Sequence, residues 1–221
     1  KETTSMSLQT IVDNATYIEV DKGKVAAQSV SRSGRVLTAE RATNVPYRFK
    51  IGMHKGLQYS TNRGLLEDLQ GLDVTDEATI DIGDTNTDMA YMTAYQGGIT
   101  GGNLTAVSGA GLVLTVNASG VSGSGTLFKK GDYIQPVGNT GAYRYPYQVT
   151  ADVAFTTSSS VNIPVHRPVI HQDGVSLSSG VINKGVDVRF KVKMTRKANY
   201  RIVPYDRISF LSDFELVEII T

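Results

Sequence analysis

Apolar residues recur at every second position in several short segments of this chain, and this alternation constrains the fold more than any other feature. In 47–51, tyrosine, phenylalanine and isoleucine alternate with arginine and lysine. Because successive side chains of a β-strand point to opposite faces, such a segment buries one face and exposes the other. The pattern predicts further strands at 149–155, 161–165 and 190–194, and weaker signals predict strands at 16–20, 34–38, 78–82, 111–117, 132–137 and 214–220. The fold class is therefore expected to be mainly β.

One segment alone predicts a helix. Leu65, Leu66 and Leu69 form an apolar stripe at helical spacing. Asn62 can cap the start of this helix, and Gly71 can end it in the left-handed conformation. We therefore expect one short amphipathic helix over about 62–71 that covers one side of a sheet.

Charge is distributed unevenly along the chain. No Lys or Arg occurs between Arg63 and Lys129, and the 40 residues from Met89 to Phe128 include no charged residue and no histidine. Such segregation suits a subunit that contacts copies of itself through complementary surfaces. We expect an acidic set on one copy to meet a basic set on a neighbouring copy. The acidic candidates are Glu67, Asp68, Asp73, Asp76, Glu77 and Asp81, and the basic candidates are Arg189, Lys191, Lys193, Arg196, Lys197 and Arg201.

The uncharged stretch opens a block whose composition differs from that of the two chain ends. Its glycine-rich turns and the alternation of Leu112, Leu114 and Val116 indicate a folded segment. We expect a discontinuous β domain formed by residues 1–83 and 174–221, with a second β domain inserted at 84–173. The neutral face of the inserted block is expected to pack against protein, and the favoured partner is a neighbouring subunit.

Metal-binding patterns are incomplete. The chain has no cysteine, which excludes a disulfide framework, a thiolate nucleophile and a cysteine metal site. Asp84, Asn86 and Asp88 begin like a calcium-binding loop, but Met89 occupies the position where the sharp turn needs glycine. The favoured interpretation is a solvated acidic turn, so we expect no metal and no cofactor.

Catalytic patterns are also weak. His166, His171 and Asp173 form the only cluster of imidazole and carboxylate groups along the sequence, and their spacing does not match a helical metal pair. His54 is isolated, and no nucleophile-elbow motif is present. A pair of carboxylates that cleaves glycans stays open as a minor alternative, because separation in space is not visible in a sequence. The chain is expected not to be an enzyme.

Nucleic acid and membrane are not expected partners. The net charge of +1 gives no general attraction to either. Phe190 and Tyr200 lie among the basic residues of 189–201 and could stack on bases, but lysines that alternate with apolar residues are typical of the solvent face of a strand. No apolar run approaches the roughly 18 residues of a membrane span. We expect no membrane contact and no sequence-specific nucleic-acid binding.

Five short segments together carry a resemblance to a known family. They are 91–97 (YMTAYQG), 130–136 (KGDYIQP), 143–149 (YRYPYQV), 165–168 (VHRP) and 214–218 (FELVE). In this succession the chain resembles structural proteins of tailed-bacteriophage tails, and it is most similar to the distal tail or baseplate type that continues the tail tube. The likeness spans about residue 34 to the C terminus, and its motifs are structural rather than diagnostic of any chemistry.

The resemblance implies a tail-tube-like β-sandwich with one short helix and an inserted small β-barrel or sandwich domain. It also implies a ring, expected to be a homohexamer, at the tube end or baseplate of the virion, after assembly in the host cytoplasm. Its partners would be the tail tube protein on one side and the hub and tape-measure proteins on the other. The alternative is a host-receptor or glycan-binding module of the tail tip, in which Tyr143, Tyr145 and Tyr147 stack on sugar rings instead of packing in a barrel or an interface.

Overall fold

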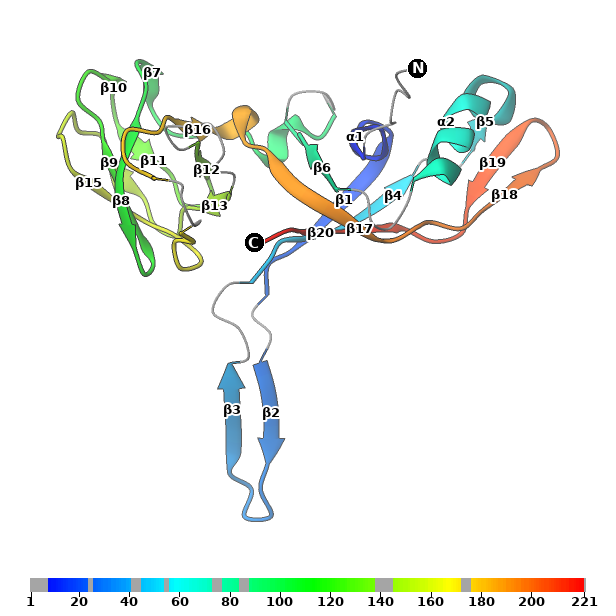
Figure 1. The fold of residues 1–221 in the computed structure, drawn as a ribbon, viewed down its shortest axis with the longest axis horizontal. Coiled ribbons are helices and arrows are strands. Elements are labelled where there is room, and N and C mark those ends of the chain that lie inside the picture. The colour runs from blue at the N-terminus through cyan, green and yellow to red at the C-terminus, as the bar shows by residue number, and fades with distance from the viewer. Residues whose placement is uncertain are drawn as a thin grey trace.

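The structure is a computed structural model, and it describes residues 8–23, 26–40, 45–53, 56–72, 77–83, 88–137, 145–171 and 176–220. Strands account for 44% of it and helices for 13%, which confirms the mainly-β fold class. Figure 1 shows a long sheet in the middle, a group of short strands at one end, helix α2 (Tyr59–Gly71) at the other end, and a hairpin that projects from the middle.

The central sheet has five antiparallel strands in the order β1-β4-β20-β17-β6. The two C-terminal strands, β20 and β17, lie between the N-terminal strands β4 and β6, so the N-terminal and C-terminal segments form one unit. Its strands are β1 (Ala15–Asp21), β4 (Arg48–Met53), β6 (Glu77–Ile80), β17 (Phe190–Arg196) and β20 (Phe214–Glu218). Each corresponds to one of the predicted strands, because these segments carry the alternation that a sheet with one buried face requires.

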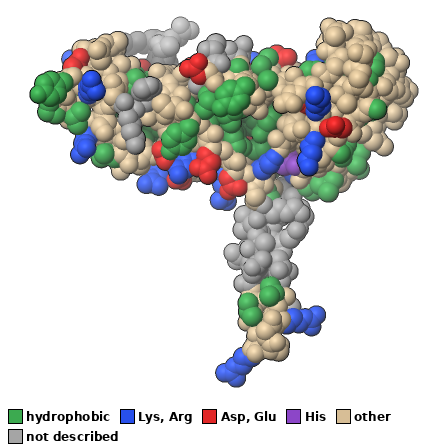
Figure 2. Space-filling model, turned by 180° about the vertical axis from the view of Figure 1, so that it is seen from behind, with side chains coloured by type: hydrophobic (Ala, Val, Ile, Leu, Met, Phe, Trp, Pro, Cys, Tyr) green, Lys and Arg blue, Asp and Glu red, His purple; other side chains and the backbone are tan. Residues whose placement is uncertain are grey.

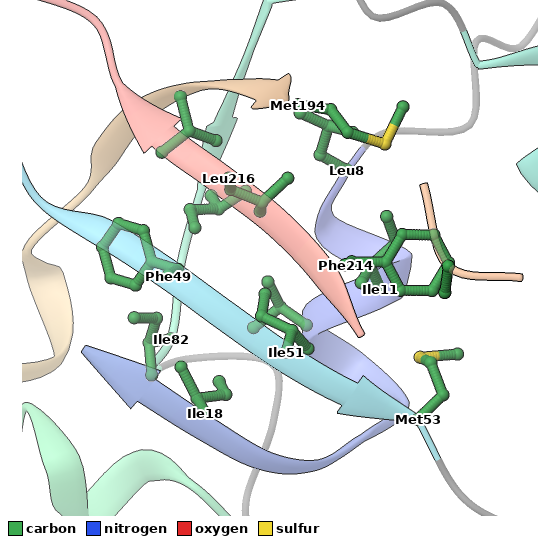
Figure 3. Packing of buried hydrophobic residues seen from close by; sticks show 14 of the residues in the cluster. Leu8, Ile11, Ile18, Phe49, Ile51, Met53, Ile82, Met194, Phe214 and Leu216 are labelled. Atoms are coloured by element: carbon green, nitrogen blue, oxygen red, sulfur yellow. The ribbon is translucent and has the colours of Figure 1, made fainter. Parts of the chain in front are cut away.

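One face of this sheet forms the first hydrophobic core. Phe49 and Ile51 of β4 and Leu216 of β20 point to the same side, where the short helix α1 (Gln9–Asp13) covers them, as Figure 3 shows. Leu8 and Ile11 are both buried at that helix. Helix α1 was not predicted, because five residues are too few to display a helical period.

Helix α2 begins earlier than the sequence predicts, and a kink at Asn62 divides it into two helical pieces. Asn62 lies inside the helix with non-helical backbone angles (φ −109°, ψ 17°), and its side chain donates a hydrogen bond to the carbonyl of Gln58. The first turn is instead held by Asp206, whose backbone carbonyl accepts the N–H of Tyr59 at 3.0 Å and whose carboxylate accepts the N–H of Ser60 at 2.8 Å. The predicted apolar stripe is confirmed, because Leu66 and Leu69 are buried.

Asp206 belongs to the turn of a second hairpin beside helix α2. This hairpin consists of β18 (Tyr200–Val203) and β19 (Arg207–Phe210), and β5 (Leu57–Gln58) pairs with β19 to complete a three-stranded sheet. The turn thus connects the C-terminal part of the chain to the start of α2.

The short strands at the other end surround a second hydrophobic core. Leu114, Val116 and Ile163 are among its buried side chains, and the registers of β9 with β8 and β15 bring them together. The strands are β7 (Ile99–Gly101), β8 (Thr105–Ala110), β9 (Val113–Asn117), β10 (Ser122–Gly123), β11 (Thr126–Phe128), β12 (Tyr133–Pro136), β13 (Tyr147–Gln148), β14 (Val153–Ala154), β15 (Val161–Pro164) and β16 (Ile182–Lys184).

This second core bears on two sequence predictions. The uncharged stretch is folded, since it supplies β7 to β11. The single strand predicted at 149–155 is wrong, because only Val153–Ala154 (β14) of this segment forms a strand, and Val149 makes an isolated bridge with Val165. Ile182 of β16 also belongs to this core, although it lies beyond the predicted boundary at 173. The division of the chain into two domains stays a prediction, and the two cores are the feature that supports it.

A hairpin of β2 (Ala26–Val30) and β3 (Val36–Glu40) projects away from the central sheet (Figure 1). Within the described residues, the two strands form a sheet of their own. Ser31 begins the connecting turn, and its backbone carbonyl accepts a hydrogen bond from the N–H of Gly34 at 2.9 Å. Gly34 has φ +77°, a value that favours glycine. The sequence pattern predicted only a strand at 34–38, so the hairpin was not expected.

Candidate functional site

A buried ion pair joins the two cores. The guanidinium of Arg167, which follows β15, donates to both carboxylate oxygens of Glu218 at 2.5 and 2.7 Å. Arg167 also donates to the carbonyls of Val45 at 3.0 Å and Pro146 at 2.8 Å. Arg167 is 2% exposed and Glu218 is 3% exposed, so both charges are shielded from bulk solvent. Four segments that are far apart in the sequence therefore meet at one charge pair.

Two aromatic rings lie close to the buried guanidinium. Its central carbon lies 5.0 Å from the ring centre of Tyr47 and 5.4 Å from that of Tyr147. Burial alone would lower the pKa of Arg167, but the hydrogen bonds and charge of Glu218 outweigh burial and raise it. The guanidinium is thus held in its charged form by the hydrogen bonds that its two Nη atoms donate, while its buried Nε has no hydrogen-bond partner among the described residues.

His166, next to the ion pair, is held neutral. Its Nδ1 accepts the backbone N–H of Gln148 at 3.0 Å, so the neutral ring carries its proton on Nε2. Nε2 is buried and has no hydrogen-bond partner among the described residues. Burial lowers the pKa of His166 to about 3, and the positive charges of Arg167 and Lys22 add to this shift. A second positive charge beside the Arg167 guanidinium is thereby avoided.

The segments that carry the family resemblance supply most of the buried polar residues. Tyr147, Arg167 and Glu218 come from three of them and meet at the ion pair. A fourth segment supplies Gln135, whose side chain donates to the carbonyl of Arg189 at 2.6 Å and accepts its N–H at 3.0 Å. It also supplies Asp132, which accepts the N–H of Gln96 at 2.9 Å in the fifth segment. These motifs therefore build the junction between the cores.

The predicted acidic and basic sets partly pair within one chain. Strands β6 and β17 are neighbours, and Glu77 lies opposite Lys193 in their register. The Lys191 ammonium contacts the Glu77 carboxylate at 2.9 Å, and Arg189 forms an ion pair with Asp81. The expectation that these residues meet between copies is corrected for both pairs, because β6 and β17 are neighbours in a single sheet.

Other members of the two sets lie at separate places. Glu67 and Asp68 are exposed on helix α2, and Asp73 and Asp76 lie outside the described residues. Among the basic members, Arg196 contacts Glu215 at 3.2 Å, Lys197 donates to the carbonyl of Gln70 at 3.1 Å, and Lys193 and Arg201 are exposed. A role for these residues in contacts between copies stays a prediction.

The open face of the central sheet carries both signs of charge. Lys50 lies between Glu19, at 3.8 Å, and Asp213, at 3.5 Å. Figure 2 shows basic and acidic side chains intermixed along this side of the body, close to the base of the projecting hairpin. Charges of both signs are therefore interspersed on this face, and Lys50 pairs with both carboxylates.

Two of the three tyrosines proposed to stack on sugars are not available for this role. Tyr145 and Tyr147 are buried, and the Tyr147 hydroxyl accepts the N–H of Ile170 at 2.8 Å. This corrects the glycan-stacking prediction for both residues, because a ring packed inside the protein cannot present its face to a ligand. Tyr143, the third member, lies outside the described residues.

No group of three or more His, Asp and Glu side chains that could hold a metal ion occurs in the described part of the chain. His166 is oriented by Gln148, whereas the Nε2 of His171 lies 3.0 Å from the carbonyl of Gly109. His54, Asp84, Asn86 and Asp173 fall outside the described ranges. The absence of catalytic activity stays a prediction.

A groove of about 560 Å³ lies beside strand β1. Tyr17 forms part of its wall, and the tyrosine hydroxyl donates to Asp213 at 2.6 Å. This hydrogen bond raises the pKa of Tyr17. Gly52 lies opposite Tyr17 in the register of β1 and β4, and a Cβ atom there would lie 2.1 Å from the tyrosine ring, so a larger residue would displace this ring. Leu211 contributes an exposed apolar side chain to the same groove.

The tip of the β2–β3 hairpin is an exposed feature that the sequence pattern did not predict. Val30 and Val36 are 69% and 56% exposed and lie opposite each other in the register. Arg32 and Arg35 lie in the turn between them, and Figure 2 shows basic and hydrophobic side chains together near the end of the hairpin. The serine and glycine residues of 29–36 were the available signal, because they flank a turn between two apolar positions.

No protein-family model matches the sequence, and no curated protein matches it significantly. Among the described residues, no helix combines the length and apolar character that a membrane span needs. Any functional assignment therefore depends on the motif segments and on the geometry of the exposed surfaces.

Proposed function

We propose that this chain is a structural subunit of a bacteriophage tail. In this proposal it forms a homo-oligomeric ring, of six copies as the resemblance implies, at the tube end or baseplate of the virion. The ring joins the tail tube to the hub and tape-measure proteins. The resemblance in the five motif segments supplies the type of assembly. The geometry adds that these motifs build a junction between two cores.

The observation that carries the self-assembly part is the projecting β2–β3 hairpin. A two-stranded hairpin is marginally stable in water by itself, and it is normally stabilised by further strands or by a packed surface. This hairpin presents an exposed valine pair and two arginines at its tip. Such an element is favourable where another chain covers it, as in a ring of copies.

The alternative of a host-receptor or glycan-binding module has lost part of its basis. Two of the three tyrosines on which it rested are buried. The open sheet face also carries interspersed charges of both signs, so it favours no strongly charged ligand.

The mass of the native particle tests the proposal. The full chain is purified without denaturant, and its mass is measured by light scattering over a range of protein and salt concentrations. Negative-stain images of the same sample then report its shape. We expect a ring with the mass of about six copies. A protein that stays monomeric at every concentration contradicts the proposal.

A further inference from the structure

The hairpin tip and the Tyr17 groove have matching chemistry. The tip presents the Val30–Val36 pair beside two arginines. The groove presents Tyr17 and Leu211, which are 44% and 59% exposed, beside the carboxylate of Asp213. The apolar side chains on both surfaces are about half exposed to solvent. A contact between the two surfaces would bury this apolar area and so stabilise the complex.

The charges near the groove also suit a basic occupant. Lys50 lies 3.5 Å from Asp213 and 3.8 Å from Glu19, so two carboxylates share one ammonium group. The local balance is one negative charge. The hairpin turn 31–35 carries two arginines and no acidic residue. Opposite charges on two surfaces favour their encounter and fix their orientation.

The two surfaces lie at opposite ends of the same strand. The hairpin follows the Asp21 end of β1, whereas Thr16 and Tyr17, at the other end of β1, line the groove. Figure 1 shows the hairpin pointing away from the sheet, so the tip does not reach the groove of its own chain. A tip that fills such a groove must therefore come from a second copy.

We infer that the β2–β3 tip of one copy docks in the Tyr17–Leu211 groove of a second copy. The contact joins two different surfaces, so it is head-to-tail, and repetition closes it into a ring or extends it into a filament. Val30 and Val36 cover Leu211 and the Tyr17 ring, while Arg32 and Arg35 approach Asp213. This inference rests on the proposed self-assembly and names the surfaces that carry it.

Cysteine crosslinking tests the contact directly, because the natural chain has no cysteine. One full-length variant carries Ser33→Cys at the tip, and a second carries Leu211→Cys in the groove. The two are mixed and oxidised, and the products are separated on a non-reducing gel. We expect a disulfide-linked dimer in the mixture. The matched control replaces the groove variant by Leu112→Cys, since Leu112 is 54% exposed but lies on the second core.

Three results overturn the docking contact. They are no dimer in the mixture, an equal yield with Leu112→Cys, and a high yield with Ser33→Cys alone, which indicates that two tips meet. The mass of the oligomer separates this failure from that of the proposed function. A ring-sized particle without the crosslink overturns only the docking contact, whereas a monomer without the crosslink overturns both.

Charge reversal at the tip gives a second measurement. Arg32→Glu with Arg35→Glu should weaken self-association at least tenfold at low salt, with a smaller effect at high salt. The control, Lys129→Glu with Lys130→Glu, makes the same change in net charge on the second core. Thermal unfolding checks that both variants fold. Equal self-association of the two variants contradicts the role of the arginines.

Discussion

Arg167 and Glu218 form a bidentate ion pair across a sequence separation of 51 residues, with N–O distances of 2.5 and 2.7 Å. The pair links the loop after β15 to the last strand of the central sheet. The Glu218 carboxylate also accepts the N–H of Tyr47 at 3.0 Å, so it connects to the segment before β4. This single charge pair therefore ties the second core to two neighbouring strands of the sheet.

Removing one partner of this pair should be costly. Glu218→Gln leaves the Arg167 charge buried without its counter-ion, and we expect a loss of about 3–5 kcal/mol in the free energy of unfolding. Urea unfolding followed by circular dichroism measures this loss. The double variant Arg167→Met with Glu218→Leu should recover part of it, because no buried charge remains. A loss below about 1 kcal/mol in the single variant would show that water reaches the pair.

His166 should make stability depend on pH. Its pKa in the folded state is about 3, below the ordinary value of 6.5, so the unfolded chain binds a proton first as the pH falls. This contribution to stability is complete above pH 6.5 and is lost progressively between pH 6.5 and 3. The expected slope is at most about 1.4 kcal/mol per pH unit.

The His166→Asn variant isolates this effect, because an asparagine oxygen can still accept the Gln148 N–H. Unfolding by urea is measured from about pH 7 to about pH 4 for the natural chain and the variant. We expect a shallower pH dependence in His166→Asn, while His171→Asn should keep the natural slope. Identical slopes for all three proteins would contradict the role assigned to His166.

Two glycine substitutions should have opposite effects. A Cβ atom on Gly98 would lie 1.8 Å from the carbonyl oxygen of Ser124, so Gly98→Ala must displace backbone and should cost about 1–3 kcal/mol or more. Gly64 lies in helix α2, and a methyl group there would have no atom within 4 Å. Gly64→Ala should therefore stabilise the protein by about 0.5–1 kcal/mol. Melting temperatures of the two variants provide the measurement, and a stabilised Gly98→Ala would contradict the close approach of Gly98 to Ser124.

The two ion pairs between the β6 and β17 segments should contribute unequally. The Glu77–Lys191 pair is about half exposed, so Glu77→Gln should change the free energy of unfolding by less than about 1 kcal/mol. Asp81 is buried and also accepts the N–H of Gly83 at 3.0 Å. Asp81→Asn should therefore cost about 1–3 kcal/mol. Equal effects in urea unfolding, or a larger effect of Glu77→Gln, would contradict this order.

The sequence predicts the central sheet well and the junction poorly, for physical reasons. Each strand of the sheet has one face in the core and one face toward solvent. The sequence shows this difference directly, because buried Phe49 and Ile51 alternate with polar residues. The Arg167–Glu218 pair has no such local signature, because its partners are far apart in the chain. Asp206 was missed as the group that holds the start of α2 for the same reason, since it lies 146 residues from Ser60.

The charge sets illustrate a different limit. Acidic 67–88 and basic 189–201 are visible as separate blocks in the sequence, which favoured contacts between copies. Their separation along the chain conceals the fact that β6 and β17 are adjacent, so that Lys191 meets Glu77 within one sheet. A charge pattern in the sequence shows that residues of opposite charge are present. Only the strand order shows whether they form ion pairs within one chain or between two chains.

The chain leaves the central sheet through β6 and returns through β17, and these strands pair directly, with Ile80 opposite Phe190. Exit and entry are therefore neighbours, and a short turn is long enough to connect them. This arrangement makes the intervening segment exchangeable in evolution: it can be lengthened, shortened or replaced while the sheet keeps its strand order. Glu218 constrains such a replacement. Without the second core this carboxylate loses its partner Arg167, so the residue must also change or become neutral.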